Sequence, residues 1–248
     1  MIRRIEEITI NAWPSLQTYV YDGWLIRFAD GYTKRANSIN PLYESSEKLE
    51  RKIDYCESIF QDRDLPVVFK LTDESKPVEL DEVLEKRGYS KVDITSLQIL
   101  DLTDKDIILL DQAEICIIER ELSDRWLITF SKFSNLSNKE KDTMNQMLNK
   151  STVENFYFTL VVDREIIACG LAVQEGRYFG LFDIIVSEEY RGRGYGEELI
   201  KSMLNFARNN SAQIAYLQVV QSNFPAINLY SKLGFKEVYQ YWYRGLYS

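Results

Sequence analysis

Apolar positions recur along the chain with two spacings, alternating over some stretches and following a period of three to four residues over others. Alternation indicates a strand, whereas the longer period indicates an amphipathic helix. In the first hundred residues the pattern predicts helix 5–16, strands 19–21, 24–28 and 36–39, a helix running to residue 60, strand 67–71, helix 80–87 and strand 89–99. We expect Pro14 to interrupt the first helix, Asp22-Gly23 to form a hairpin turn, and Ser45 or Ser46 to cap the longer helix.

Residues 101–111 change from polar to apolar and are interpreted as a linker that leads into residues 114–119. After it the pattern predicts helix 123–133, with Ser123 or Asp124 as its cap, and helix 139–148. It then predicts strands 156–162, 166–173 and 178–186, helix 197–209, strand 212–220, a short helix that Gly234 stops, and a strand at 239–244. This succession favours an α/β (α+β) chain with a mixed sheet flanked by helices.

Part of this order occurs twice. The segment KRGYSKV at residues 86–92 parallels KLGFKEV at residues 232–238, and each follows a helix, a strand and a short helix. We interpret the chain as two copies of one unit, with domains at residues 1–105 and 110–248; the alternative is chance similarity between two glycine-rich helix ends. Where the second copy has Tyr230, the first has Leu84.

The densest glycine pattern in the chain is YRGRGYGE at residues 190–197, between a predicted strand and a predicted helix. The first turn of a helix offers unpaired backbone N–H groups and a positive dipole end, so this junction suits a phosphate or pyrophosphate group. Gly192, Gly194 and Gly196 are the residues here that can take positive φ at little cost. The alternative is a tight surface turn. In the first copy, residues 37–46 occupy this place and contain no glycine.

The spacing of the loop excludes three common phosphate loops. A Walker loop requires Gly-Lys-Ser/Thr, and Glu197 follows Gly196 here. The dinucleotide fingerprint GxGxxG and the kinase glycine loop differ from GxGxG in spacing, and the next strand carries no acidic residue.

The pattern Arg-x-x-Gly-x-Gly, from Arg191 to Gly196, resembles the acetyl-CoA loop of the GNAT acyltransferase superfamily. The resemblance extends over residues 155–244 through FDIIV at 182–186, YLQV at 216–219 and LGF at 233–235. It implies a GNAT-like fold with a mixed, mostly antiparallel sheet and acetyl-CoA as cosubstrate. Together with the repeat it implies two tandem units, of which the N-terminal one is degenerate and does not bind CoA.

The resemblance also implies roles for individual residues. It places the cofactor along the strand end, the loop and one asparagine: Ile184, Ile185, Val186, Arg191, Gly192, Arg193, Gly194, Tyr195, Gly196 and Asn223. Asn223 also suits a helix N-cap, because Pro225 follows in the first turn.

The reaction implied is attack of an amine on the thioester carbonyl, in a ternary complex with acetyl-CoA. Tyr230 matches the usual proton donor to the departing thiolate; the alternative is a ring packed on the sheet. Asp183 interrupts an apolar strand and is the position where we look first for a general base, with a structural hydrogen bond as the alternative. The acceptor is a small-molecule or peptide amine. The competing function is a non-catalytic acyl-CoA sensor or interaction module.

Composition narrows the function classes. The formal net charge of −8 argues against a nucleic-acid partner. The chain has no histidine, no paired cysteines and no calcium-loop pattern, so no metal site is expected. Its three cysteines are expected as buried free thiols. Without an apolar signal core or spanning segment, we expect a cytoplasmic protein with no membrane partner. Oligomeric state is not predicted, and the aromatic run 239–244 suits either an acceptor pocket or sheet packing.

Overall fold

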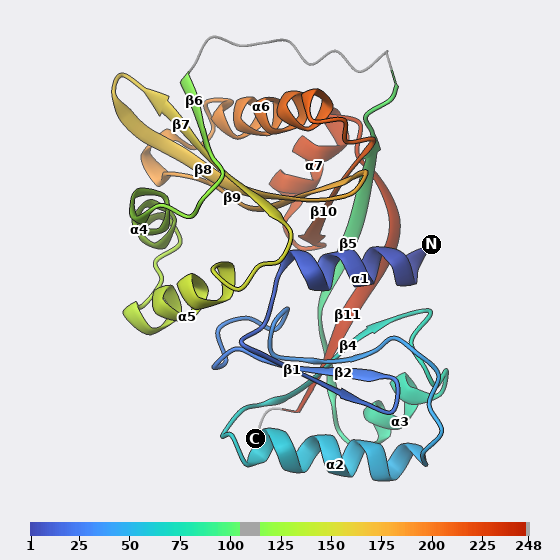
Figure 1. Ribbon diagram of the computed structural model, residues 1–248. Helices are drawn as coiled ribbons and strands as arrows, with labels where there is room; N and C mark the ends of the chain where they lie inside the picture. The colour runs from blue at the N-terminus through green and yellow to red at the C-terminus, as the bar shows by residue number, and fades with distance from the viewer. Residues whose placement is uncertain (105–114, 247–248) are drawn as a thin grey trace. The chain divides into compact units, whose positions relative to one another are not determined.

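The computed structural model describes residues 1–104 and 115–246, and Figure 1 shows its helices and strands. Most of the expected linker, with residue 114 of the segment after it, lies outside the described residues. The described elements are α1 (Ile2–Ala12), β1 (Gln17–Tyr21), β2 (Trp24–Phe28), β3 (Ile39–Pro41), α2 (Leu49–Gln61), β4 (Val67–Thr72), α3 (Leu80–Lys86), β5 (Ser90–Asp101), β6 (Ile115–Glu119), α4 (Asp124–Phe133), α5 (Asn138–Leu148), β7 (Glu154–Val162), β8 (Glu165–Glu175), β9 (Tyr178–Val186), the 3-10 turn η1 (Glu188–Tyr190), α6 (Tyr195–Asn209), β10 (Ile214–Val220), α7 (Phe224–Lys232) and β11 (Lys236–Leu246).

Two compact units make up the chain. The N-terminal unit comprises residues 1–96, 220–222 and 239–248, and the C-terminal unit comprises residues 97–219 and 223–238. This division differs from the expected one, in which the last strand belonged wholly to the C-terminal domain. The reason is strand pairing: β11 runs antiparallel to β4, from Tyr241 opposite Thr72 to Leu246 opposite Val67.

In the N-terminal unit the strand order is β1-β2-β3-β4-β11-β5. The β1–β2 hairpin turns at Asp22-Gly23, as predicted, with Tyr21 opposite Trp24. Side chains from β2, β4, α2 and α3 form its core, among them Trp24, Phe69 and Phe60. The helix α2 therefore covers the sheet with the face that carries Ile53, Cys56 and Phe60.

Three expected boundaries in this unit are wrong. Helix α1 begins at Ile2 rather than Ile5. It ends at Ala12, and the expected interruption by Pro14 is confirmed, because a proline disfavours the helical conformation of the residue before it. The third strand is β3, at Ile39–Pro41, rather than 36–39. Asn37 lies instead in a loop, where its Oδ1 accepts hydrogen bonds from the backbone N–H groups of Ala29 and Gly31.

The third difference concerns the start of α2. Its N-cap is Lys48, and no side chain caps it. The two serines proposed as caps, Ser45 and Ser46, donate their hydroxyl hydrogen bonds to the Asp22 carboxylate instead.

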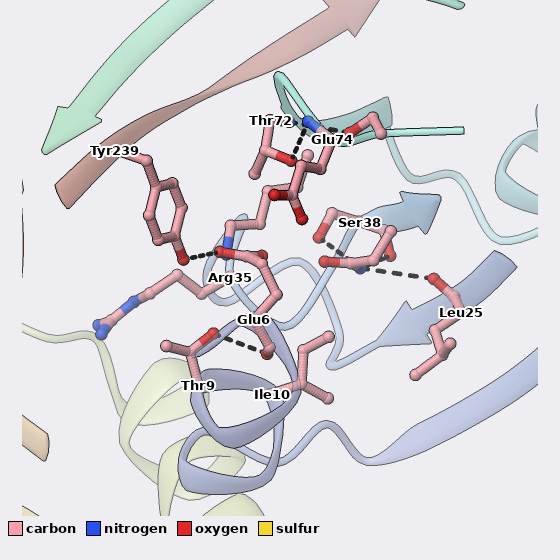
Figure 2. Close-up of polar contacts among 12 residues, drawn as sticks. Glu6, Thr9, Ile10, Leu25, Arg35, Ser38, Thr72, Glu74 and Tyr239 are labelled. Atoms are coloured by element: carbon pink, nitrogen blue, oxygen red, sulfur yellow. Dashed lines mark hydrogen bonds and ion pairs between the residues drawn. The ribbon is translucent and has the colours of Figure 1, made fainter. Parts of the chain in front are cut away.

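A buried ion pair joins three elements of the N-terminal unit. The Glu6 carboxylate on α1 accepts a 2.6 Å hydrogen bond from Lys70 Nζ on β4 and a 2.7 Å bond from the Tyr239 hydroxyl on β11. Figure 2 shows the Tyr239 ring directed at Glu6, with the Thr9 hydroxyl bonded to the Glu6 backbone carbonyl. The side chains of Glu6 and Lys70 are 2% and 5% exposed. Burial lowers the pKa of Lys70, against the effect of Glu6.

In the C-terminal unit, β6, β7, β8 and β9 pair antiparallel in sequence order, and β10 joins β9 in parallel. The mostly antiparallel mixed sheet is thus confirmed. Helix α6 lies along it with Leu199, Ile200 and Met203 buried against side chains of β7, β8 and β9. The predicted cap of α4 is also confirmed, since the Ser123 side chain accepts from the N–H of Trp126.

Element order and backbone geometry agree with the internal repeat. The series α2-β4-α3-β5 is matched by α6-β10-α7-β11. Gly88 and Gly234, which follow the two short helices, both have φ of 91°. The amide after each glycine reaches the same position, from Tyr89 to Leu84 O and from Phe235 to Tyr230 O, each at 3.0 Å. Leu84 therefore corresponds to Tyr230, as the sequence spacing predicts.

The three cysteines are free, as expected. Cys56 and Cys169 are buried, whereas Cys116 is only partly buried. The described residues contain no helix long and apolar enough to cross a membrane.

Candidate active site

The site begins where β9 separates from β10. Their parallel pairing runs from Tyr178 opposite Ile214 to Leu181 opposite Leu217, and β9 continues beyond this pairing to Val186. The backbone of residues 184–186 lies past the pairing with β10 and is held on its other side by β8.

That other edge carries a bulge. Leu171 lies opposite Phe182, and Cys169 lies opposite Ile185, so Gly170 alone faces both Asp183 and Ile184. Asp183 has φ of 50°, in the left-handed region. An extra residue bends the backbone of its strand, and here the bend lies next to residues 184–186.

The glycine loop follows this strand end. Gly192 and Gly194 have φ of 76° and 89°, and Gly194 is the N-cap of α6. Gly194 has no side chain, so the N-cap residue gives the first-turn N–H groups of α6 no side-chain acceptor. The expectation that these two glycines take positive φ is confirmed.

Gly196 is the third residue here that could take positive φ, and it does not. It lies in the first turn of α6 and has no positive φ. A Cβ at Gly196 would meet Val186 Cγ2 at 3.6 Å and Leu229 Cδ2 at 3.7 Å, so the missing side chain leaves space between the strand end and α7.

The two loop arginines have different local roles. Arg191 Nε donates to the Val186 carbonyl at 3.1 Å, which fastens the loop to the end of β9. Arg193 lies over the Tyr190 ring, with its guanidinium carbon 5.3 Å from the ring centre. The Tyr190 hydroxyl in turn donates to Glu165 at 2.8 Å. The loop is therefore held by its own side chains.

A cavity of about 660 Å³ joins the end of β9, the loop and α7. The predicted residues that line it are Ile184, Ile185, Val186, Arg191, Gly192, Gly194, Tyr195, Gly196, Asn223 and Tyr230. Arg193 and Asp183 are not among its lining residues. The sequence interpretation did not assign six further lining residues to the site: Tyr190, Glu197, Ile200, Pro225, Ala226 and Leu229. Helical spacing contained a signal for part of this set, since Ala226, Leu229 and Tyr230 lie on one face of α7.

Tyr230 lies between the apolar core and the cavity. Its ring packs against Phe235 at a centroid distance of 6.0 Å and against the apolar core, and it also lines the cavity. Burial raises the pKa of Tyr230 to about 12. The phenol therefore remains protonated through the neutral range.

Asn223 is a helix cap at the cavity wall. Its Oδ1 accepts a 3.3 Å hydrogen bond from the N–H of Ala226, with Pro225 in the first turn of α7. The expected cap is confirmed, and lining the cavity is compatible with it.

Asp183 lies at the bulge with a half-buried side chain. It is close enough to Cys169 to add to the rise of that thiol's pKa, which burial chiefly causes. The structure thus places Asp183 beside the cavity-lining residue Ile184.

Comparison with known proteins decides the family. The family model described as "Probable histone acetyltransferase Rv0428c C-terminal" matches residues 1–244. The chain belongs to this family. A protein of Bacillus subtilis named uncharacterized N-acetyltransferase YobR is 30% identical over 253 residues, which cover 98% of each chain. The probable histone acetyltransferase Rv0428c of Mycobacterium tuberculosis is 24% identical over 220 residues, or 88% of this chain and 66% of that protein.

Solved structures agree on the fold. A GCN5-related N-acetyltransferase from Kribbella flavida superimposes with a TM-score of 0.73 at 12% identity, over 98% of this chain and 94% of that one. A tandem GNAT protein from the clavulanic acid biosynthesis pathway gives a TM-score of 0.66 at 11% identity, over 97% and 87% of the two chains. This member of the Rv0428c C-terminal family thus has the GNAT fold, and its relatives are N-acetyltransferases. The described residues hold no group of side chains suited to a metal ion.

Proposed function

We propose that this protein is an N-acetyltransferase that transfers the acetyl group of acetyl-CoA to the amine of a small molecule or peptide, by direct attack in a ternary complex. The observation that carries the proposal is the single cavity lined by the end of β9, the glycine loop and Tyr230. An anion cradle, backbone groups beside the acyl carrier and a proton donor are three parts that suit acyl transfer from a CoA thioester.

Each of these three parts has one role in the proposed reaction. The N–H groups at the start of α6 bind the pyrophosphate, aided by the dipole of the helix. The backbone of residues 184–186 binds the pantetheine arm and orients it. Acetyl-CoA supplies the activated acyl group, and the oxyanion that forms on attack is stabilised by backbone N–H groups at the bulge.

Tyr230 donates its proton to the departing thiolate. Its position on the cavity wall suits this role, and burial keeps the phenol protonated. The acceptor amine loses a proton before or during attack, and we assign this step to Asp183, at the bulge, directly or through water.

The two units have separate tasks in this proposal. The C-terminal unit, which carries the loop and Tyr230, binds acetyl-CoA and performs the transfer. The N-terminal unit is a degenerate relative without the loop, and Leu84 replaces the tyrosine at the corresponding position.

The test is thiol release from acetyl-CoA by purified protein with a panel of amines. The names of relatives suggest the panel: a peptide with a free α-amine, a histone peptide and thialysine. Turnover should depend on one of these classes, and Tyr230→Phe should lower kcat by about 100-fold or more, within the range of general acid catalysis, while the Kd for CoA stays within about twofold.

The competing function is an acyl-CoA-binding module without catalysis. It predicts CoA binding with no turnover of any amine in the panel. Equal kcat for Tyr230→Phe and the unmodified protein would remove Tyr230 from the reaction, and absence of acetyl-CoA binding would contradict the proposal as a whole.

A further inference from the structure

The N-terminal unit has an anion cradle of its own, and a side chain of the same unit fills it. The Asp22 carboxylate, on the β1–β2 turn, accepts hydrogen bonds from the backbone N–H of Ser46 at 3.0 Å and of Glu47 at 2.9 Å. It also accepts from the hydroxyls of Ser45 and Ser46, both at 2.8 Å. Four donors from one short loop thus converge on one carboxylate.

A buried lysine completes the cradle. The side chain of Lys52, on the first turns of α2, is 0% exposed, and its Nζ lies 3.2 Å from Asp22 Oδ2. Nζ also donates to the Asp22 carbonyl at 2.6 Å and to Ser45 Oγ at 2.5 Å, and it lies 4.0 Å from the centre of the Trp24 ring. A fully buried ammonium group is costly unless it is paired, and Asp22 supplies the pairing charge.

The location matches that of the glycine loop in the other copy. The loop with Ser45, Ser46 and Glu47 leads into α2, and residues 191–194 lead into α6, the corresponding helix of the repeat. In the C-terminal unit the residues Gly192 and Gly194 at this place line a cavity, whereas in the N-terminal unit the amides of Ser46 and Glu47 bind Asp22. The donors, in turn, hold the pKa of the Asp22 carboxyl well below its usual range, so that it stays ionised.

We propose that Asp22 is a built-in anion that occupies, in the N-terminal unit, the place that the pyrophosphate of acetyl-CoA takes in the C-terminal unit. The chain consequently binds one acetyl-CoA, and the N-terminal unit uses the corresponding cradle to fasten the β1–β2 turn to α2. The comparison between the units rests on the proposed function, whereas the contacts of the Asp22 carboxylate with the N-terminal cradle do not.

Variants that remove or replace the Asp22 carboxylate test this proposal. In Asp22→Gly the glycine accepts the positive φ of 41° without strain, so the variant removes only the carboxylate. Hydrogen exchange of the full-length protein, resolved by peptides covering residues 42–50 and 188–198, separates the two cradles. We expect the amides of Ser46 and Glu47 to exchange about tenfold faster or more in Asp22→Gly. Millimolar acetate or inorganic phosphate should restore their protection in this variant.

The unmodified protein is the first control: its 42–50 peptide should not respond to phosphate, acetate or acetyl-CoA, whereas its 188–198 peptide should gain protection from acetyl-CoA. Asp22→Asn is the matched variant, because Asn keeps the shape and tolerates positive φ but lacks the charge. It should lose protection by an intermediate factor and gain less from added anions than Asp22→Gly does.

Three outcomes would overturn the inference: protection of the 42–50 peptide by acetyl-CoA in the unmodified protein, unchanged exchange in Asp22→Gly, or lost protection that neither anion restores. Failure of the proposed function gives a different result, namely a 188–198 peptide that does not respond to acetyl-CoA. The two failures are therefore read from different peptides.

Discussion

At the scale of single residues, Gly196 shows how the site uses the absence of a side chain. Gly192 and Gly194 are required by their positive φ, which other residues adopt only with strain. Gly196 is helical, so its backbone accepts any residue, and only the space between Val186 and Leu229 restricts it. Stability and cofactor binding therefore place opposite demands on this position.

Gly196→Ala separates these demands. Alanine favours the helix by up to about 1 kcal/mol relative to glycine, so the melting temperature should stay equal or rise. The added methyl group narrows the cavity, and we expect the Kd for CoA to rise by roughly tenfold or more, equivalent to ~1.4 kcal/mol. Calorimetric titration with CoA measures the Kd, and a thermal melt measures the melting temperature.

The control is Asn205→Ala on α6, which gains helix propensity away from the cavity. Unchanged CoA affinity in Gly196→Ala would contradict the assignment of this space to the cofactor.

Tyr230 gives a second residue-scale prediction, on pH. A tyrosine with the ordinary pKa of 10.0 would be half ionised at pH 10, whereas with its pKa raised to about 12 roughly one in a hundred is ionised there. Since the protonated phenol is the active donor, the basic limb of kcat should show no decline between pH 8 and about pH 10. Stopped-flow thiol release measures it. A fall in kcat with a midpoint near pH 10, absent in Tyr230→Phe, would show that Tyr230 titrates at its ordinary value.

At the scale of elements, the sequence was informative wherever a local pattern determines structure. Strand and helix periods, the Ser123 cap and the two glycines that follow α3 and α7 all depend on neighbours within a few residues. The start of α2 was missed because Ser45 and Ser46 bond to Asp22, more than twenty residues away. A serine before an amphipathic helix has the same local signature whether it caps the helix or binds a distant carboxylate.

In the candidate site, too, the sequence identified what is local and missed what depends on distant contacts. The motif identified the loop and the strand end, which are contiguous in sequence. It did not identify Ala226 and Leu229 as lining residues, because their contribution depends on how α7 packs beside β9. The bulge at Asp183 was also not predicted, since it arises from pairing with β8, where Gly170 faces two residues.

The Glu6–Lys70 pair yields a prediction about elements, because it connects α1 to β4. Glu6→Ala leaves a buried ammonium group uncompensated and removes the acceptor of the Tyr239 hydroxyl. We expect a loss of about 3–5 kcal/mol in the free energy of unfolding of the N-terminal unit. Urea unfolding followed by circular dichroism measures it.

The control for this prediction is the double variant Glu6→Met with Lys70→Met, which removes both charges and retains apolar volume. It should recover a substantial part of the lost stability, because no buried charge is left unpaired. A double variant less stable than Glu6→Ala would indicate that the two residues stabilise the fold independently of each other.

At the scale of the whole molecule, the chain is not two consecutive domains. β11 starts in the C-terminal unit, directly after the helix that carries Tyr230, and its residues from Tyr239 onward belong to the N-terminal unit. There it lies between β4 and β5 in the strand order. The sequence suggested a division near residues 105–110, because nothing local distinguishes a last strand that completes its own unit from one that completes the other.

Because β11 supplies a strand of the N-terminal unit, we predict that this unit cannot fold from residues 1–104 alone. A fragment of residues 1–104 lacks the strand between β4 and β5 and the two partners of Asp81, since Trp242 Nε1 and Arg244 Nε donate to its carboxylate at 2.7 and 2.8 Å. It also leaves Glu6 without the Tyr239 hydroxyl. Without the strand between β4 and β5 the sheet loses both hydrogen bonds and apolar burial, so we expect the fragment to show no cooperative thermal transition.

Fusing residues 236–246 to the fragment through a glycine-serine linker should restore a cooperative transition, whereas the same fusion with Trp242→Ser and Arg244→Ser should not. Cooperative unfolding of the fragment alone, observed by calorimetry, would show instead that the first four strands with β5 suffice as a folding unit.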